Sequence, residues 1–456
     1  MNQIASAVAA ETNTLSRSLR PRHVTMIAIG GIVGAGLFVG SSAAIAAAGP
    51  AILVTYALTG FLVLLIMRML GEMAVGMPEV RSFTEFARVG LGNWAGFSVG
   101  WLYWFFWVVV VPVEAIAGAA IIEKWIALPT WQIGVVLMAI MTAVNLLSAR
   151  AYGEFEFWFS SIKVTAIIAF ILVAAAYAFG FISEGGTGFA SLTAHGGFAP
   201  SGWLTAVAAV PTVIFSMMGA EIVTIAAVES PEPARAVARM SSSVITRILI
   251  FYVGSILMVL CVVPWNLVVP GQSPFTLALD TMHIPFASTI MAWIILTAVL
   301  SCLNSAFYVC SRVLFVLAGH GDAPRWLVKT NKRQVPSHSV MLASVAGFAG
   351  VIAAILSPSL VFAFLLNASG ALIVYIYLAI AVSQVRVRTR QERAGKPPVL
   401  PMWLFPWLSY FAIAGFLAVL IALAITPARF VEFWTSAISV AVALVAYAVL
   451  RRNRQG

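Results

Sequence analysis

The chain reads IGGIVGAGLFVG from Ile29 to Gly40, in the middle of its first long apolar segment. Five glycines in eleven residues weaken a helix, each by about 1 kcal/mol relative to alanine. One interpretation is a packing surface, because Gly30 with Gly34 and Gly36 with Gly40 have the spacing of closely packed membrane helices. The other is an unwound segment whose free amides and carbonyls face a cavity. The stretch on its own favours neither interpretation.

The composition makes lipid the main solvent of this chain. Of its 456 residues, 62% are hydrophobic and 9% are charged, whereas soluble domains carry roughly 25% charged residues. The apolar runs are continuous rather than alternating, which favours membrane helices over a β-barrel. The three cysteines have no paired spacing, so neither a disulfide framework nor a zinc site is indicated.

Apolar runs of about 20 residues, the length that crosses a bilayer as a helix, recur along the whole chain. Two pairs of spans are separated only by Gly49-Pro50 and by Ser357-Pro358, where proline ends a helix. The expected fold class is therefore an all-α polytopic membrane protein with twelve transmembrane helices. The expected spans are 25–48, 51–70, 95–122, 131–149, 157–181, 203–228, 242–264, 287–317, 339–356, 359–384, 404–425 and 430–450.

The basic residues fall on one side of this expected bundle. Twelve spans place both termini on the same side, and of the 26 Lys and Arg only Lys124, Lys163 and Arg429 lie elsewhere. The positive-inside rule then predicts cytoplasmic tails at 1–23 and 451–456 of a cell-membrane protein. This distribution explains the net charge of +10 as topology and argues against nucleic acid as a partner.

A second interruption lies in the sixth span, which reads FSMMGAE from Phe215 to Glu221. A glycine and a carboxylate sit at mid-span, and a charged residue at that depth usually faces a polar interior. Spans one and six are five apart, so a repeat of the first five spans is inverted in the membrane. Interrupted helices at matching positions of inverted halves indicate a transporter site at the midplane, which favours the unwound interpretation of Gly30–Gly40. The expected units are the repeats 24–181 and 203–384 and the additional helices of 404–450.

The ends of interrupted helices supply the chemistry of such a site. Residues just after the first break present free N–H groups and the positive end of a half-helix dipole, which attract an anion such as a carboxylate. The break in the sixth span, at Met218 and Gly219, offers carbonyls to an ammonium group. The pair suits a zwitterion.

Ionisable and amide groups elsewhere in the spans each have a functional and a structural interpretation. Glu114 could bind an ammonium or carry a proton, or it could partner a neighbouring hydroxyl or amide. Lys163 could take part in proton coupling, because a buried lysine can release its proton, or it could snorkel to the cytoplasmic face. Glu221 could bind substrate, but we favour a bracing role for it at the broken helix. Asn304 is more typical of a helix–helix hydrogen bond.

Short motifs follow one another along nearly the whole chain. The first two are LRPRHVTM at residues 19–26 and GAGLFVGS at 34–41. The others are GWLYW at 100–104, YGEFEFW at 152–158, GAEIVTIAA at 219–227, SCLNSA at 301–306, Arg312, and GDAP at 321–324. Together they resemble the bacterial amino acid permeases of the amino acid–polyamine–organocation superfamily, and among them most of all the gamma-aminobutyrate permeases.

The resemblance implies an inverted-repeat fold like that of the bacterial leucine transporter, with uptake driven by the proton gradient and no cofactor or metal. The stretch Gly34-Ala35-Gly36 matches the family's carboxylate-binding turn, and Phe215 matches its aromatic gate over the substrate. Lys163 matches the lysine that replaces a sodium ion in proton-coupled relatives, and Glu114 matches a carboxylate common in this branch. Met217 stands where a second aromatic is usual, so the pocket size departs from the pattern.

The expected function is import of gamma-aminobutyrate or a near relative with protons. The ammonium of the substrate is expected near the carbonyls of span six, including Met217, and near Glu114 and Tyr103 in span three. The nearest alternative is a permease of the same family for an aromatic, cationic or small neutral amino acid. An enzyme is disfavoured by the lack of a ligand set in the spans, and a passive channel by the paired interruptions.

Overall fold

The computed structural model describes residues 22, 23, 26, 33–77, 80, 82–147, 149–182, 186–219, 221–222 and 248–455. The side chains of 149–151, 359–360, 362–364, 366–368, 370 and 452–455 are outside this description. Gly30 and Gly31, and the basic cluster at 235–239, also lie outside the described residues.

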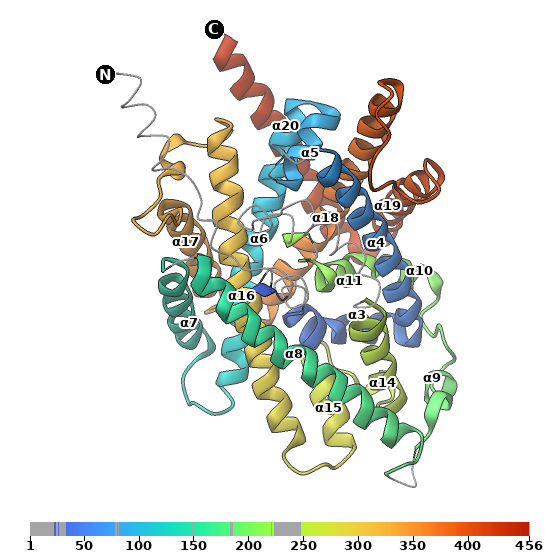
Figure 1. Ribbon diagram of the computed structural model, residues 1–456. Helices are drawn as coiled ribbons and strands as arrows, with labels where there is room; N and C mark the ends of the chain where they lie inside the picture. The colour runs from blue at the N-terminus through green and yellow to red at the C-terminus, as the bar shows by residue number, and fades with distance from the viewer. Residues whose placement is uncertain are drawn as a thin grey trace.

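Every regular element in the described part of the chain is helical, and α16 (Ala287–Gly319) runs from the upper to the lower end of the molecule in Figure 1. The elements that matter most for the site are η1 Gly36–Gly40, α3 Ser41–Ala48, α4 Ile52–Gly76, α6 Asn93–Ile122, α8 Ala149–Ala178, α11 Val210–Met217, α16 Ala287–Gly319 and α18 Pro358–Arg393. The others are η2 Gly49–Ala51, α5 Phe83–Leu91, α7 Thr130–Asn145, η3 Gly188–Ala190, α9 Ser191–Ala194, α10 Trp203–Ala208, η5 Ile248–Gly254, α14 Ser255–Val262, η6 Trp265–Leu267, α15 Pro274–Thr281, η7 Arg325–Val328, α17 Ser337–Ala353, α19 Trp407–Ile425, η8 Pro427–Arg429 and α20 Phe430–Gln455.

Seven of the described helical stretches are long and apolar enough to cross a membrane. They are Gly36–Gly76, Asn93–Ile122, Tyr152–Ala178, Ala287–Gly319, Ala371–Arg393, Trp407–Ile425 and Pro427–Arg451. Shorter apolar helices cover Thr130–Asn145, Trp203–Met217, Ile248–Val262 and Ser337–Ala353. The chain is therefore an all-helical, polytopic membrane protein, and the number of twelve crossings stays a prediction.

The two proline-marked breaks fall where the sequence places them. Gly49 has φ +61°, and a β-carbon there would lie 2.6 Å from the Cγ of Pro200, so only glycine fits between α3 and α4. α17 ends at Ala353, and α18 begins at Pro358. In both places the chain leaves one helix and starts another within a few residues.

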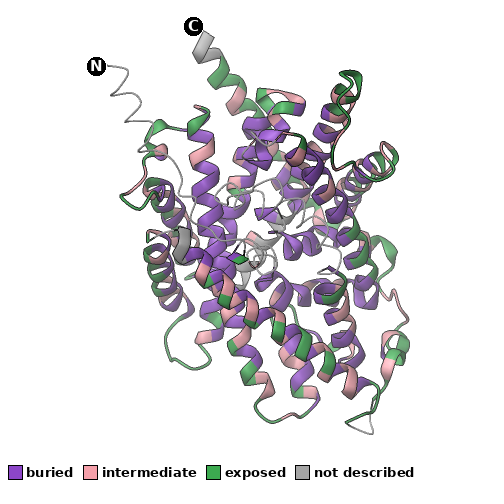
Figure 2. Ribbon diagram, viewed as in Figure 1, coloured by how far each residue is buried: buried purple, intermediate pink, exposed green. Residues whose placement is uncertain are grey.

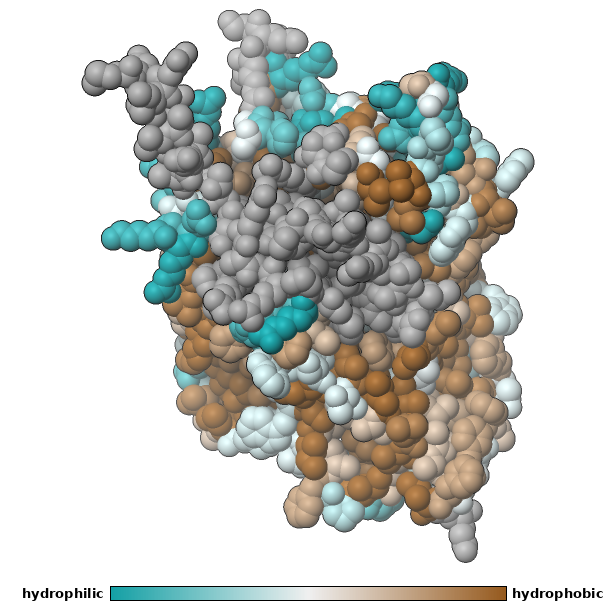
Figure 3. Space-filling view, viewed as in Figure 1, coloured by the Kyte–Doolittle hydropathy of each residue, from teal (hydrophilic) through white to brown (hydrophobic). Residues whose placement is uncertain are grey.

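α6 and α16 pack against each other in the interior of the bundle, and Figure 2 shows buried residues along both. The outer surface is apolar as well: Leu172 on α8 is 65% exposed and Val445 on α20 is 62% exposed. Figure 3 shows hydrophobic residues gathered over the lower half of one face and hydrophilic residues at its upper end. Large apolar side chains on the outside are stable in lipid, which agrees with a membrane-embedded bundle.

Candidate functional site

The sixth expected span is interrupted in the interior of the bundle. α11 ends at Met217, and Met218 takes an extended conformation with φ −64° and ψ 148°. Gly219 follows with φ +111°, in the left-handed region that favours glycine. The helix thus stops beside the glycine that suggested the break. At its end the carbonyl of Phe215 accepts from the N–H of Met218, and that of Ser216 accepts from the hydroxyl of Tyr252 at 2.6 Å.

The first expected span is not helical at Val33 and Gly34, but Gly36–Gly40, which was expected to be unwound as well, is helical. Ala35 is the N-cap of η1, which continues into α3. A β-carbon at Gly36 would lie 2.7 Å from the Cα of Ser216 on α11, so the start of η1 and the end of α11 are in direct contact. The amides at the start of one helix and the carbonyls at the end of the other therefore lie side by side.

A small cavity, lined by buried residues, lies between these segments, α6 and α16. Its volume is about 10 Å³, which is close to the space of one water molecule. An amino acid enters only when side chains that line the cavity move aside. Its walls are Gly34, Gly36, Phe106, Trp107, Val110, Glu114, Phe215, Ser216, Met218 and Cys302.

Five of the predicted substrate contacts line the cavity, namely Gly34, Gly36, Phe215, Met218 and Glu114. Ala35, Met217, Gly219 and Tyr103 are outside the cavity lining, although Ala35 contributes a backbone amide to Glu114. The lining residues that were not predicted are Phe106, Trp107, Val110, Ser216 and Cys302. A signal for three of them exists in the sequence, because Trp107 and Val110 lie two turns and one turn before Glu114, with Phe106 one turn earlier than Val110.

Glu114 is bound to the first interrupted helix. Both of its carboxylate oxygens accept from the backbone N–H of Ala35, at 3.2 Å and 3.1 Å. The side chain is buried, and a β-carbon at Gly34 would lie 2.8 Å from its Oε1. Cys302 borders the same point from α16, 2.7 Å from that position. The carboxylate can therefore approach this end of the helix only because residue 34 has no β-carbon.

Glu221 holds the second interrupted helix to two neighbouring helices. It accepts hydrogen bonds from the hydroxyl of Tyr103 on α6, at 2.9 Å, and of Tyr377 on α18, at 3.1 Å. The backbone N–H of Gly219 also donates to it, at 3.3 Å. Tyr103 thus points to Glu221 rather than into the cavity. This arrangement supports a bracing role for Glu221, which stays a proposal.

Lys163 lies on α8 between the first interrupted segment and α16. Its ammonium donates to the carbonyl of Val33 at 3.1 Å and to the hydroxyl of Ser301 at 2.8 Å. The carboxylate of Glu156 lies 3.7 Å away, and both side chains are fully buried. Ser301 also donates to Glu156, at 2.7 Å. The amine does not snorkel to an aqueous face.

Glu156 was not predicted as a site residue, although a signal for it was present. It precedes Lys163 by seven residues, which places both on one face of α8, two turns apart. Ser160, between them on that face, donates to Glu156 at 3.0 Å, and Ser305 donates from α16 at 3.3 Å. A carboxylate with this many donors is satisfied in a buried place.

Asn304 lies away from the cavity. Its side-chain oxygen accepts from the amide of Asn145 on α7, at 2.8 Å. This is a helix–helix hydrogen bond of the kind its sequence position suggested. The gating role proposed for it is not tested by this contact. Among the described residues, no group of three or more His, Cys, Asp or Glu could hold a metal ion.

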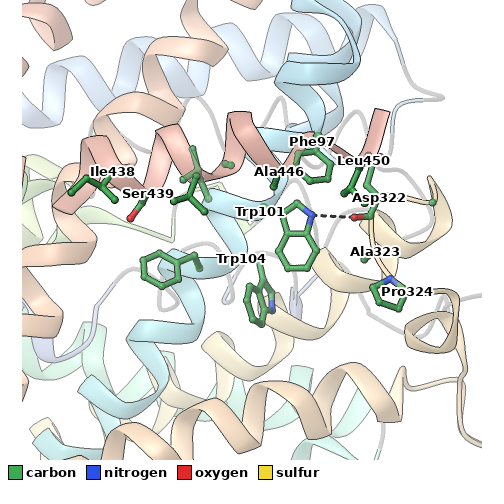
Figure 4. Close-up of a pocket in the computed structure, with 15 residues that line it drawn as sticks. Phe97, Trp101, Trp104, Asp322, Ala323, Pro324, Ile438, Ser439, Ala446 and Leu450 are labelled. Atoms are coloured by element: carbon green, nitrogen blue, oxygen red, sulfur yellow. Dashed lines mark hydrogen bonds between the residues drawn. The ribbon is translucent and has the colours of Figure 1, made fainter. Parts of the chain in front are cut away.

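A larger cavity, of about 580 Å³, lies between α6, α20 and the loop at 321–324 (Figure 4). Trp101 is one of the lining residues, and its indole N–H donates to the carbonyl of Asp322 at 3.1 Å. The carboxylate of Asp322 binds Arg88, which also pairs with Glu85 at 3.0 Å. Burial lowers the pKa of Arg88, but the two carboxylates outweigh it and raise the pKa above its ordinary value. None of the predicted substrate contacts lines this cavity.

These features define a class of protein. An apolar helical bundle, in which one helix starts and another ends beside a cavity lined by buried residues, fits the architecture of a membrane transporter. A family model described as "Amino acid permease" matches residues 23–455. The chain belongs to the amino acid permease family, so the resemblance inferred from its motifs is confirmed and the protein is a transporter rather than an enzyme.

Curated relatives cover nearly the whole chain. It is 44% identical over 443 residues to the gamma-aminobutyric acid permease of Bacillus subtilis, and the matched region covers 96% of this chain and 94% of the relative. It is 47% identical over 431 residues to the probable GABA permease of Pseudomonas aeruginosa, with coverage of 93% and 90%. It is 38% identical over 415 residues to the aromatic amino acid transport protein AroP of Corynebacterium glutamicum, with coverage of 90% and 89%.

Proposed function

We propose that this permease imports gamma-aminobutyrate (GABA), or a closely related amino acid, by proton symport with alternating access. The names of its relatives at 44% and 47% identity support GABA as the substrate. The observation that carries the mechanism is the contact of Gly36, at the start of one helix, with Ser216, at the end of another, beside a cavity lined by buried residues. A site between two helix ends binds both charges of a zwitterion without a basic side chain.

In this proposal the carboxylate of the substrate binds the amides of Gly34, Ala35 and Gly36. The ammonium lies toward the carbonyls at the end of α11 and toward Glu114. Phe215 and Met218 line the cavity between these ends and close over the aliphatic part of the substrate. Met217, which lies outside the lining, affects the pocket through the position at which α11 ends.

Proton coupling is proposed to act through the pair of Lys163 and Glu156. The ammonium connects Val33, on the first interrupted segment, to Ser301 on α16. A change in its protonation alters that connection, because a neutral amine donates more weakly than an ammonium to a carbonyl. The two segments are then free to move relative to each other, which is what alternating access requires.

The topology we propose is twelve spans, with inverted repeats at 24–181 and 203–384 and two further helices at 404–450. Both termini, with the tails 1–23 and 451–456, are proposed to be cytoplasmic. The interrupted helices and the uneven distribution of Lys and Arg support this arrangement. The test introduces single cysteines at positions 124 and 392. Each is labelled with a thiol reagent, once from outside intact vesicles and once in opened vesicles.

The substrate is tested by uptake of labelled GABA into proteoliposomes, with a panel of unlabelled competitors. GABA is expected to compete better than aromatic, cationic or small neutral amino acids, and empty vesicles give the background. The relatives named for aromatic amino acid transport make an aromatic substrate the second candidate. Robust uptake of an aromatic amino acid, without uptake of GABA, would replace the first candidate by the second.

A further inference from the structure

The carboxylate of Glu114 accepts from the backbone N–H of Ala35, and in the proposed function the same N–H binds the carboxylate of the substrate. We infer that Glu114 is a tethered competitor, which a zwitterionic substrate displaces from Ala35 and then neutralises with its own ammonium. A simple carboxylate without an amine cannot complete this exchange. The inference rests on the proposed function and deepens it, because it names the feature that restricts the site to zwitterions.

The geometry shows a carboxylate that already fills an anion site. Both oxygens of Glu114 lie within 3.2 Å of the Ala35 amide, at the start of the helix formed by η1 and α3. The side chain is 1% exposed and lies in the cavity wall beside Gly34 and Cys302. Its carboxylate is the one carboxylate among the residues that line this cavity. A second carboxylate reaches the amide only after Glu114 leaves it.

The charges around Glu114 decide what happens after displacement. α11 presents Phe215, Ser216 and Met218 to the cavity, and none of them is charged. α16 presents the thiol of Cys302. Among the described residues a cation near Glu114 is Lys163 on α8, and its ammonium is already bound to Val33, Ser301 and Glu156.

Two carboxylates placed together in such a cavity repel each other. A bound monocarboxylate brings no cation that could offset this repulsion. A zwitterion brings one with it. The substrate's ammonium takes the place that the Ala35 amide held as the partner of Glu114, and its carboxylate takes the place of Glu114 on Ala35. No net charge is added to the cavity. Repulsion by the Glu114 carboxylate therefore selects against a simple acid.

The test compares two ligands that differ by the amine, GABA and butyrate. Binding of each is measured on purified wild-type protein and on E114Q, which keeps the shape of the side chain and removes its charge. Butyrate is expected to bind E114Q about tenfold more tightly than it binds wild type, while GABA gains nothing. E123Q, at an exposed carboxylate on the end of α6, is the matched control and is expected to leave both affinities unchanged.

Two other roles for Glu114 give different results. If it only pairs with an ammonium, E114Q weakens GABA and leaves butyrate unchanged, which overturns the inference. If it only braces the helix, E114Q leaves both ligands unchanged, which also overturns it. Should E114Q fail to fold, E114D serves instead: its carboxylate is about 1.5 Å shorter and withdraws from Ala35. GABA is then expected to bind about threefold more tightly than to wild type, and equal or weaker binding contradicts the inference.

Failure of the proposed function looks different from failure of this inference. If wild type binds another amino acid and not GABA, the substrate claim falls, and the same comparison is made with that amino acid and its deaminated acid. If wild type binds butyrate as tightly as GABA, transport of GABA stands and the tethered competitor falls. If wild type binds no amino acid, both fall.

Discussion

The ammonium of Lys163 lies 3.7 Å from the carboxylate of Glu156, and both side chains are fully buried on one face of α8. Two opposite charges that are removed from water are stable only when they satisfy each other and further hydrogen bonds complete their shells. Ser301 supplies such a bond to both partners. The pair thus ties α8 to α16 and, through Val33, to the first interrupted segment.

Removal of one charge of this pair is expected to destabilise the protein. Glu156→Gln leaves a buried ammonium with reduced compensation, at a cost of about 3–5 kcal/mol in the free energy of unfolding. Thermal unfolding of purified protein in detergent measures the loss. Ser160→Ala, which removes one hydrogen bond to the same carboxylate, is the control, with an expected cost of about 1 kcal/mol. Equal stability of the two variants contradicts this account of the pair.

Lys163→Ala is expected to abolish accumulation of substrate driven by a pH gradient. The amine joins Val33 to Ser301 through two hydrogen bonds, so its loss is expected to uncouple the segment at Val33 from α16. Lys124→Ala, at an exposed lysine, is the control and keeps full accumulation. The double variant K163M/E156Q, which removes both charges, is expected to be more stable than E156Q. Its accumulation of substrate is expected to be abolished as in K163A. Unchanged accumulation in K163A removes Lys163 from the coupling mechanism.

Gly36→Ala is expected to reduce transport by about tenfold or more. Its β-carbon would lie 2.7 Å from the Cα of Ser216, and backbone cannot yield as a side-chain end does. Overpacking of this kind costs about 1–3 kcal/mol and here separates the two helix ends that form the site. Gly319→Ala is the matched control, because a β-carbon at that position meets nothing within 4 Å. Initial rates of uptake, with expression measured in parallel, distinguish the two; equal rates contradict the contact between the two helices.

Tyr103→Phe and Tyr377→Phe are each expected to lower the stability of the protein by about 1–3 kcal/mol. Each removes a hydrogen bond to the buried carboxylate of Glu221, so the free-energy cost of desolvating that carboxylate is less fully offset. Tyr410→Phe, at a residue that is 50% exposed, is expected to have no effect. Thermal unfolding checks all three. If the three variants have the same stability, Glu221 does not brace the end of α11.

Much of the helical architecture could be predicted from the sequence, because apolar length, proline and glycine act locally. The split at Gly49 and the end of α11 beside Gly219 follow from such local signals. The long-range contacts could not be predicted in the same way. Glu114 and Ala35 are 79 residues apart in the chain, and Glu221 and Tyr377 are 156 apart. No local pattern says which donor a buried carboxylate will find.

Two features of the site show where pattern reading fell short. Phe106, Val110 and Glu114 share one face of α6, so their spacing from the carboxylate is a signal. An apolar helix has such spacing on every side, so this signal alone does not distinguish the face that lines the cavity. Glu156 lies in a motif of alternating acidic and aromatic residues, EFEF, near the start of α8. Its burial becomes evident only when α16 brings Ser301 and Ser305 against it.

The most direct measurement of the central claim is accumulation of labelled GABA in proteoliposomes under an inside-alkaline pH gradient. The account predicts accumulation above the external concentration, its collapse when a protonophore dissipates the gradient, and its loss in K163A. Uptake that only equilibrates, with or without the gradient, would contradict proton symport.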